Sequence, residues 1–154
     1  MKKMKTPRES VIVDELLHAS LSEAWEAITD PVHMKRWYFD NMPDFKPETG
    51  FTTSFIMKSG GKIFTARWKV TEVVPGKKIV CEWSYKEYSG TGIVTFILSP
   101  EKEKTRITVI NEGLETFPQD IPEFTKESCF AGWEFFIRNN LPKYLENNAP
   151  ATGG

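Results

Sequence analysis

Cysteine and histidine, which build most metal and disulfide sites, are scarce in this sequence. It contains two cysteines, Cys81 and Cys129, and two histidines, His18 and His33. The cysteines lack the spacing of a zinc site and are too few for a disulfide framework, so we expect reduced thiols among apolar neighbours. No serine, cysteine or carboxylate stands at a spacing that would pair it with either histidine. We therefore predict no metal, no cofactor and no nucleophilic catalytic site.

Excess charge and long apolar runs are also missing. The formal net charge is -1, which argues against a nucleic-acid partner, because proteins that bind a phosphate backbone normally present a strongly basic face. The N-terminal segment MKKMKTPRES is charged and no sustained apolar stretch follows it. We therefore predict neither a signal peptide nor a membrane anchor, and expect a soluble cytoplasmic protein.

The length of 154 residues suits one domain that buries a core without disulfides or metals. No internal repeat or low-complexity linker interrupts the chain. We expect a flexible N-terminus at residues 1–9, a single domain at residues 10–146 and a flexible tail at residues 147–154.

The first part of the domain predicts one strand and two short helices. A β-branched run within residues 10–19 is typical of a strand. Ser22 is expected to cap the first helix, because serine accepts a hydrogen bond from the free amide groups of a first turn. A second short helix is expected from about residue 32 to Trp37.

From residue 51 to residue 111, apolar side chains recur at every second position in five segments. Gly60-Gly61 and Pro75-Gly76 mark two of the turns between them. Alternation with short turns indicates an antiparallel meander with one apolar face and one wet face. Together with the first strand, these segments predict a curved sheet of six strands.

The period changes in the last part of the chain. From about Glu123 to residue 147, apolar residues including Phe130, Trp133 and Ile137 recur at steps of three and four, which predicts a long helix. Pro142 lies inside it and should kink it or break its hydrogen bonding locally. An apolar sheet face and an apolar helix stripe bury each other, so the predicted fold class is α+β, with the sheet wrapped around the helix.

Four segments, in this order, resemble one known family: ASLSEAWEAITDPVHMKRW, VTEVVPGKKIVCEW, VTFILSPEKEKTRITV, and Gly132-Trp133 in the last helix. They are similar to START-like domains (SRPBCC, birch-pollen-allergen fold), specifically the group named after the activator of heat shock protein 90 ATPase. The resemblance covers about residues 10–146. It implies a helix-grip fold of order β-α-α-β-β-β-β-β-α, with a hydrophobic cavity between the sheet and the long helix.

The resemblance implies less about activity, because relatives on this fold include chaperone cofactors, lipid and hormone carriers, and cyclases. The eukaryotic co-chaperone of this group also carries a separate N-terminal chaperone-binding domain, for which a chain of 154 residues has no room. We therefore do not expect a chaperone-activating role.

Aromatic residues make up 13% of the chain. Most of the candidate cavity residues are aromatic side chains on the inward register of the sheet or on the apolar face of the last helix, and Trp37 precedes the expected cavity mouth. They either enclose an apolar ligand or fill the space themselves. The candidates are Trp37, Phe55, Phe64, Trp68, Trp83, Tyr85, Phe96, Asn111, Trp133 and Phe136.

Asn111 is the polar member of this set. A buried amide needs a partner, which is either backbone, water or a ligand that it orients. The leading hypothesis is a domain that binds a hydrophobic or amphipathic small molecule without catalysis. The alternatives are a protein-interaction or chaperone-related module, and a hydrolase or cyclase that uses the same cavity. Both a monomer and a homodimer through an exposed strand edge stay open.

Overall fold

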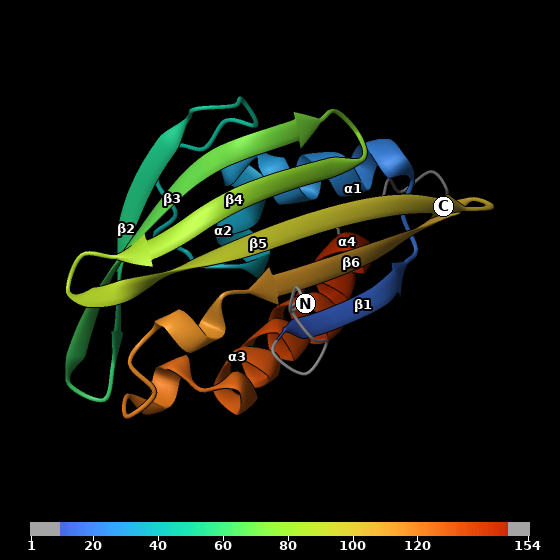
Figure 1. Ribbon diagram of the computed structural model, residues 1–154. Coiled ribbons are helices and arrows are strands. Elements are labelled where there is room, and N and C mark those ends of the chain that lie inside the picture. Colours follow the sequence, from blue (N-terminus) through green and yellow to red (C-terminus); the bar gives the residue numbers. More distant parts are fainter. Residues whose placement is uncertain (1–9, 148–154) are drawn as a thin grey trace, which may run out of the picture.

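The computed structural model describes residues 10–147, which form one antiparallel sheet curved around a long helix (Figure 1). The strand order is β1-β6-β5-β4-β3-β2, so β2 to β6 form a meander and β1 pairs with β6. The strands are β1 (Val11–Leu17), β2 (Thr52–Ser59), β3 (Lys62–Val74), β4 (Lys78–Tyr85), β5 (Tyr88–Glu101) and β6 (Lys104–Glu112). The predicted fold class is confirmed. The expected flexible ends lie outside the described residues, apart from Asn147.

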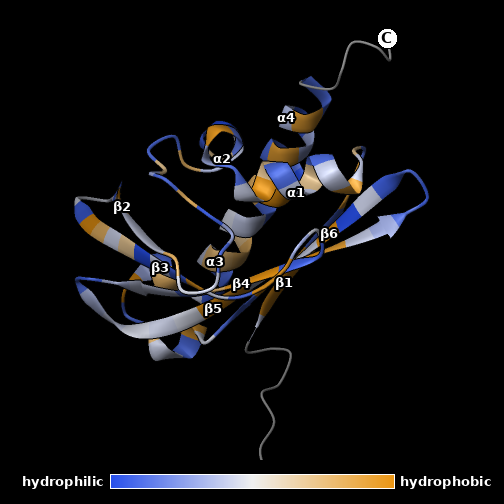
Figure 2. Ribbon diagram, turned by 90° about the horizontal axis from the view of Figure 1, so that it is seen from above, coloured by the Kyte–Doolittle hydropathy of each residue, from blue (hydrophilic) through white to orange (hydrophobic). Residues whose placement is uncertain are grey.

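The α-helices lie on one side of the sheet (Figure 2). Two short helices follow β1, and two 3-10 turns separate β6 from the long C-terminal helix. None of the helices within residues 10–147 is long and apolar enough to cross a membrane. Their bounds are α1 (Leu21–Thr29), α2 (Pro31–Trp37), η2 (Leu114–Thr116), η3 (Pro122–Phe124), α3 (Lys126–Trp133), η4 (Glu134–Asn140) and α4 (Leu141–Asn147).

The N-cap of helix α1 lies two residues before the predicted cap. Ser20, not Ser22, is its N-cap: the Ser20 hydroxyl accepts from the amide of Glu23 at 3.1 Å, and the Glu23 carboxylate accepts from the amide of Ser20 at 2.8 Å. This reciprocal pair satisfies two amide groups that the first turn leaves free. The prediction of Ser22 was wrong because it ignored the acidic residue that must stand three positions after the cap.

The long helix runs from Lys126 to Asn147 and changes its hydrogen-bond pattern on the way. Thr125 caps it, so it begins three residues after the predicted start at Glu123. Segment η4 is π-helical and ends directly before α4, whose second residue is Pro142. Proline has no amide hydrogen to donate to the preceding turn, which explains why the regular α pattern breaks at this point.

The long helix buries one face against the sheet. Trp133, Ile137 and Leu141 are buried at steps of four residues, a spacing that places side chains on one face of a helix. Phe130 was expected on the same face and is instead 38% exposed, so that prediction was wrong.

Alternation along the strands produces the core as predicted. In β3 the buried residues Phe64, Ala66, Trp68 and Val70 stand at every second position, and their neighbours face the outer side of the sheet. Arg138 of the long helix donates from Nε to the backbone oxygen of Asp14 at 3.0 Å, which fixes the helix to β1. The helix therefore lies against the concave face, and the remaining space lies toward β2, β3 and β4.

Candidate functional site

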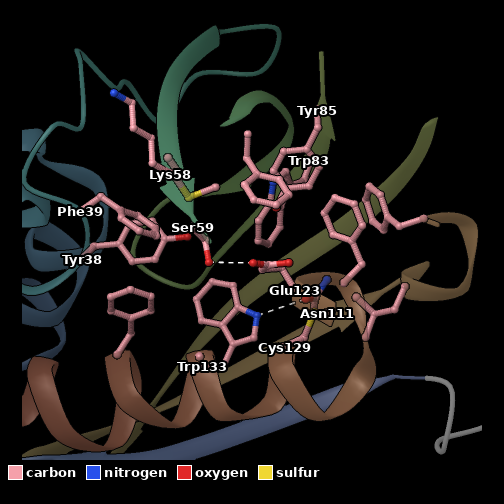
Figure 3. Close-up of a pocket in the computed structure, with 17 residues that line it drawn as sticks. Tyr38, Phe39, Lys58, Ser59, Trp83, Tyr85, Asn111, Glu123, Cys129 and Trp133 are labelled. Atoms are coloured by element: carbon pink, nitrogen blue, oxygen red, sulfur yellow. Dashed lines mark hydrogen bonds between the residues drawn. The ribbon is translucent and has the colours of Figure 1, made fainter. Parts of the chain in front are cut away.

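A cavity of about 270 Å³ lies between the concave face of the sheet and the long helix (Figure 3). Its lining comes from the segment after α2, from β2, β3, β4 and β6, from the loop between β6 and the long helix, and from α3 and η4. Most of these side chains are aromatic. The sheet, the loop and the helix thus enclose an almost entirely apolar space.

The most exposed lining residues lie on β2. Lys58 and Ser59 of β2 are exposed, and Gly132 and Phe136 of the helix are partly exposed. Phe64 of β3, Tyr85 of β4 and Asn111 of β6 are buried, whereas Trp83 of β4 is partly exposed. We infer that the cavity opens between the β2 edge and the helix.

Six of the ten candidate residues from the sequence line this cavity. Each belongs to a strand or helix whose hydrophobic period predicts which way the side chain points. The strand residues point to the inner face of the sheet, and the helix residues face the sheet. They are Phe64, Trp83, Tyr85, Asn111, Trp133 and Phe136.

The other four candidates are buried beside the cavity and are not among its lining residues. Trp37 packs against α1 and donates its indole hydrogen to the carbonyl oxygen of Ala27 at 2.7 Å. Phe55 and Trp68 contact each other edge to face, with ring centroids 5.9 Å apart, and Phe96 packs edge-on against Trp133 at 5.7 Å. These side chains fill the core. The strand or helix register determines that a side chain points inward, but packing against its neighbours determines whether it reaches the cavity.

Several lining residues have no counterpart among the candidates. Tyr38 follows the last residue of α2, where the chain leaves helical geometry and turns the side chain toward the cavity. Phe117 and Phe124 come from the irregular segment after β6, and their rings stack with centroids 5.2 Å apart. Irregular segments carry no hydrophobic period, so pattern analysis could not place them. The remaining such residues are Phe39, Met57, Lys58, Ser59, Leu114, Glu123, Cys129 and Gly132.

Asn111 is held by the protein itself. Its Oδ1 accepts a hydrogen bond from Nε1 of Trp133 at 3.1 Å, and its Nδ2 lies 3.5 Å from the carbonyl oxygen of Ile93. An indole nitrogen can only donate, so the amide oxygen must face it. Of the two roles considered for Asn111, these contacts favour the structural one, because they orient the indole that forms one wall of the cavity.

Glu123 brings the cavity its carboxylate. The Ser59 hydroxyl donates to Oε2 of Glu123 at 2.7 Å, and Nζ of Lys62 lies 3.2 Å from Oε1 (Figure 3 draws the first contact). The hydrogen bond from Ser59, together with that from Lys62, holds the pKa of Glu123 below its ordinary value. The carboxylate is therefore ionised at neutral pH.

Burial keeps the cysteine thiol and two tyrosine phenols of the lining neutral. Burial raises the pKa of the Cys129 thiol to about 11, and it raises the pKa values of the Tyr38 and Tyr85 phenols. A thiol that stays protonated is a poor nucleophile and a poor metal ligand. Among residues 10–147, no three His, Cys, Asp or Glu side chains gather closely enough to hold a metal ion.

Comparison with known proteins agrees with this architecture. Protein CV1439 from Chromobacterium violaceum is 20% identical, with a TM-score of 0.74 over 90% of this chain and 98% of that chain. DynU16, from the dynemicin biosynthetic locus, is 27% identical with a TM-score of 0.70; the match covers 94% of this chain and 50% of DynU16. The Aha1 dimer from Colwellia psychrerythraea is 16% identical, with a TM-score of 0.69 over 92% of this chain and 98% of that chain. A comparison with curated proteins gave no match.

One family model matches most of the chain. Its description is "Activator of Hsp90 ATPase homolog 1-like protein", and the match extends over residues 18–146, from the end of β1 to the end of the long helix. This range contains every lining residue of the cavity and the segments whose resemblance was noted in the sequence. The chain belongs to the Activator of Hsp90 ATPase homolog 1-like family.

Proposed function

We propose that this protein binds a small hydrophobic or amphipathic molecule in the cavity between the sheet and the long helix. The proposal rests on one observation, a 270 Å³ apolar space that the protein's own aromatic side chains leave unfilled. A protein interior is normally packed to the density of an organic crystal, so an unfilled space of this size costs stability. An apolar ligand that fills it would restore the missing contacts, and apolar pockets of this kind are typical of small-molecule sites.

The volume limits the size of the ligand. An engineered apolar cavity of about 150 Å³ binds benzene, and by proportion this cavity accepts about ten non-hydrogen atoms. This corresponds to one aromatic or alicyclic ring system with a short substituent. Longer chains would have to extend through the opening beside β2.

Gly132 supports the proposal from the helix side. A Cβ atom at this position would meet no described atom within 4 Å, so packing does not require a glycine here. Glycine inside a helix is about 1 kcal/mol less favourable than alanine. Its backbone angles are helical, so chain geometry does not require glycine either. A ligand lying against the bare helix backbone would account for this residue.

Calorimetric titration with small aromatic compounds tests the proposal, with Gly132→Leu as the variant that fills the cavity. Naphthalene-sized compounds should bind the unmodified protein and lose at least about tenfold in affinity on the variant. Ala131→Leu is the matched control, because Ala131 is exposed on the same helix and its leucine would face solvent. If no compound of this size binds the unmodified protein, or if both leucine variants weaken binding equally, the proposal fails.

Self-association is a second candidate function. The Aha1 protein from Colwellia psychrerythraea was described as a dimer, and in this chain Ile56 and Ile63 are each 50% exposed on the β2–β3 hairpin. Sedimentation velocity across a concentration series would test this. A monomer at all concentrations would count against a homodimer, and Ile63→Lys should abolish any dimer that forms through this hairpin.

The catalytic alternative has less support. The thiol and phenols of the cavity are held neutral, and the Glu123 carboxylate already accepts from Ser59 and Lys62, so no paired acid and base face one reacting position. The cytoplasmic location expected from the sequence belongs to the proposal too, and cell fractionation would test it.

A further inference from the structure

The ligand that fits this cavity can be described more closely from the position of Glu123. This residue belongs to η3, while its partners Ser59 and Lys62 stand on either side of the turn between β2 and β3. The contacts therefore bridge the sheet and the segment before the long helix. Figure 3 shows the carboxylate among the aromatic side chains, with one oxygen toward Ser59 and the other directed away from it.

The Glu123 carboxylate retains capacity to accept a hydrogen bond. An ionised carboxylate offers about four acceptor positions. Ser59 uses one at 2.7 Å, and Lys62 approaches both oxygens, at 3.2 and 3.4 Å. The last contact is long for a hydrogen bond. A ligand in the cavity can therefore donate to this carboxylate without breaking the link between Ser59 and Glu123.

Among the described residues that line the cavity, the other polar groups that face it are uncharged. Trp83 contributes a buried indole N–H that has no hydrogen-bond partner. Oδ1 of Asn111 accepts from Trp133 at 3.1 Å, and its Nδ2 lies 3.5 Å from the carbonyl oxygen of Ile93, which is long for a hydrogen bond. Lys58 is exposed, and Figure 3 shows its ammonium directed away from the cavity. Lys62 is not a lining residue, and its charge is already opposed by Glu123. The carboxylate is thus the charged group that a bound molecule meets.

We propose that Glu123 accepts a hydrogen bond from the polar end of the ligand, so that the site selects small aromatic or alicyclic molecules bearing a hydroxyl or protonated amine and rejects carboxylates. The inference rests on the proposed binding function of the cavity. A carboxylate ligand would place a second negative charge beside Glu123 and has no hydrogen to donate to it. The surrounding aromatic faces also favour a cation over an anion.

Four probes that share one phenyl ring test the inference by calorimetry: ethylbenzene, 2-phenylethanol, 2-phenylethylammonium and phenylacetate. The alcohol and the ammonium should bind the unmodified protein about tenfold or more tightly than phenylacetate, the range expected for a hydrogen bond to a charged group. Glu123→Gln should bring the affinity of phenylacetate within about threefold of the ammonium, and should leave ethylbenzene unchanged.

Glu127→Gln is the matched control, because Glu127 is an exposed carboxylate one turn further along that does not line the cavity. It should preserve the preference of the unmodified protein. If phenylacetate binds as well as the alcohol and the ammonium, or if Glu123→Gln leaves the preference intact, the role of Glu123 is refuted while the binding function stands. If ethylbenzene and the other probes all fail to bind, the binding function itself fails. The comparison of probes on the unmodified protein does not depend on how well the variants fold.

Discussion

The indole of Trp133 donates a hydrogen bond of 3.1 Å to Oδ1 of Asn111, and this contact joins the long helix to β6 at the wall of the cavity. Asn111 is 1% exposed, so neither group can exchange this partner for bulk water. Buried polar groups that lose their partners are costly, which makes the pair a fixed point between helix and sheet. Both residues of the pair line the cavity.

Asn111→Leu should lower the free energy of unfolding by about 2 kcal/mol, because it leaves the buried indole hydrogen of Trp133 without an acceptor. Urea denaturation measures the change. Trp133→Phe removes the donor, and in that background Asn111→Leu should cost measurably less. Equal costs in the two backgrounds would show that the hydrogen bond does not couple these residues.

Gly132→Ala should raise the free energy of unfolding by about 0.5 to 1 kcal/mol. The added methyl group meets open space, and alanine has the higher helix propensity. The reverse change at the neighbouring exposed position, Ala131→Gly, should lower the free energy by a similar amount. Thermal and urea denaturation of both variants provide the comparison. A loss of stability in Gly132→Ala would mean that the space beside the helix is smaller than described.

Ser20→Ala should destabilise the protein by about 1 kcal/mol, because it removes the side-chain acceptor from the capping box of α1. Ser22→Ala, two positions later and exposed in the first turn, should change stability by less than about 0.5 kcal/mol. Chemical denaturation of the two variants side by side distinguishes the caps. A larger loss of stability in Ser22→Ala than in Ser20→Ala would show that Ser22 is the cap, as the sequence pattern suggested.

Stability should decline in alkaline solution because burial raises the pKa of the Cys129 thiol from 9.0 to about 11. The folded protein holds this proton more tightly than the unfolded chain does. The resulting stabilisation is complete below pH 9 and is lost as the pH rises from 9 toward about 11. Over this interval the group contributes a slope of about -1.4 kcal/mol per pH unit.

The measurement for this prediction is urea denaturation at several pH values, on the unmodified protein and on Cys129→Ala. The variant lacks the titrating thiol, so its stability should fall less steeply between pH 9 and about 11. Cys81, whose pKa burial raises to about 12, is present in both proteins and cancels in the comparison. Parallel curves would show that Cys129 ionises as readily in the folded protein as in the unfolded chain.

The regular part of the candidate site could be predicted from the sequence. Phe64, Tyr85 and Asn111 stand at alternate positions of strands, and Trp133 stands on the apolar stripe of the helix; all four line the cavity. A period of two or 3.6 residues fixes the direction of a side chain as soon as the element forms. The direction of a side chain did not distinguish residues that line the cavity from residues that fill the core. Phe96, for example, points inward but packs against Trp133 and does not line the cavity.

The irregular part of the site could not be predicted in this way. Glu123 was expected at the start of the long helix, yet it lies in a 3-10 turn before it, where its carboxylate reaches Ser59 across 64 positions of sequence. Phe124 beside it packs against Phe64 with ring centroids 5.5 Å apart. No local pattern encodes a contact between distant segments, because such contacts depend on where the whole chain places both partners.

By itself, the sequence determined the elements, the direction of their side chains and therefore the fold, since hydrophobic period and turn chemistry act within a few residues. It also determined the charge and the scarcity of metal-binding side chains. Only the tertiary structure decided that the aromatic side chains leave a cavity of about 270 Å³ and that one carboxylate reaches it. Volume is what remains after all side chains have packed against one another, so it is a property of the assembled core and of no single segment.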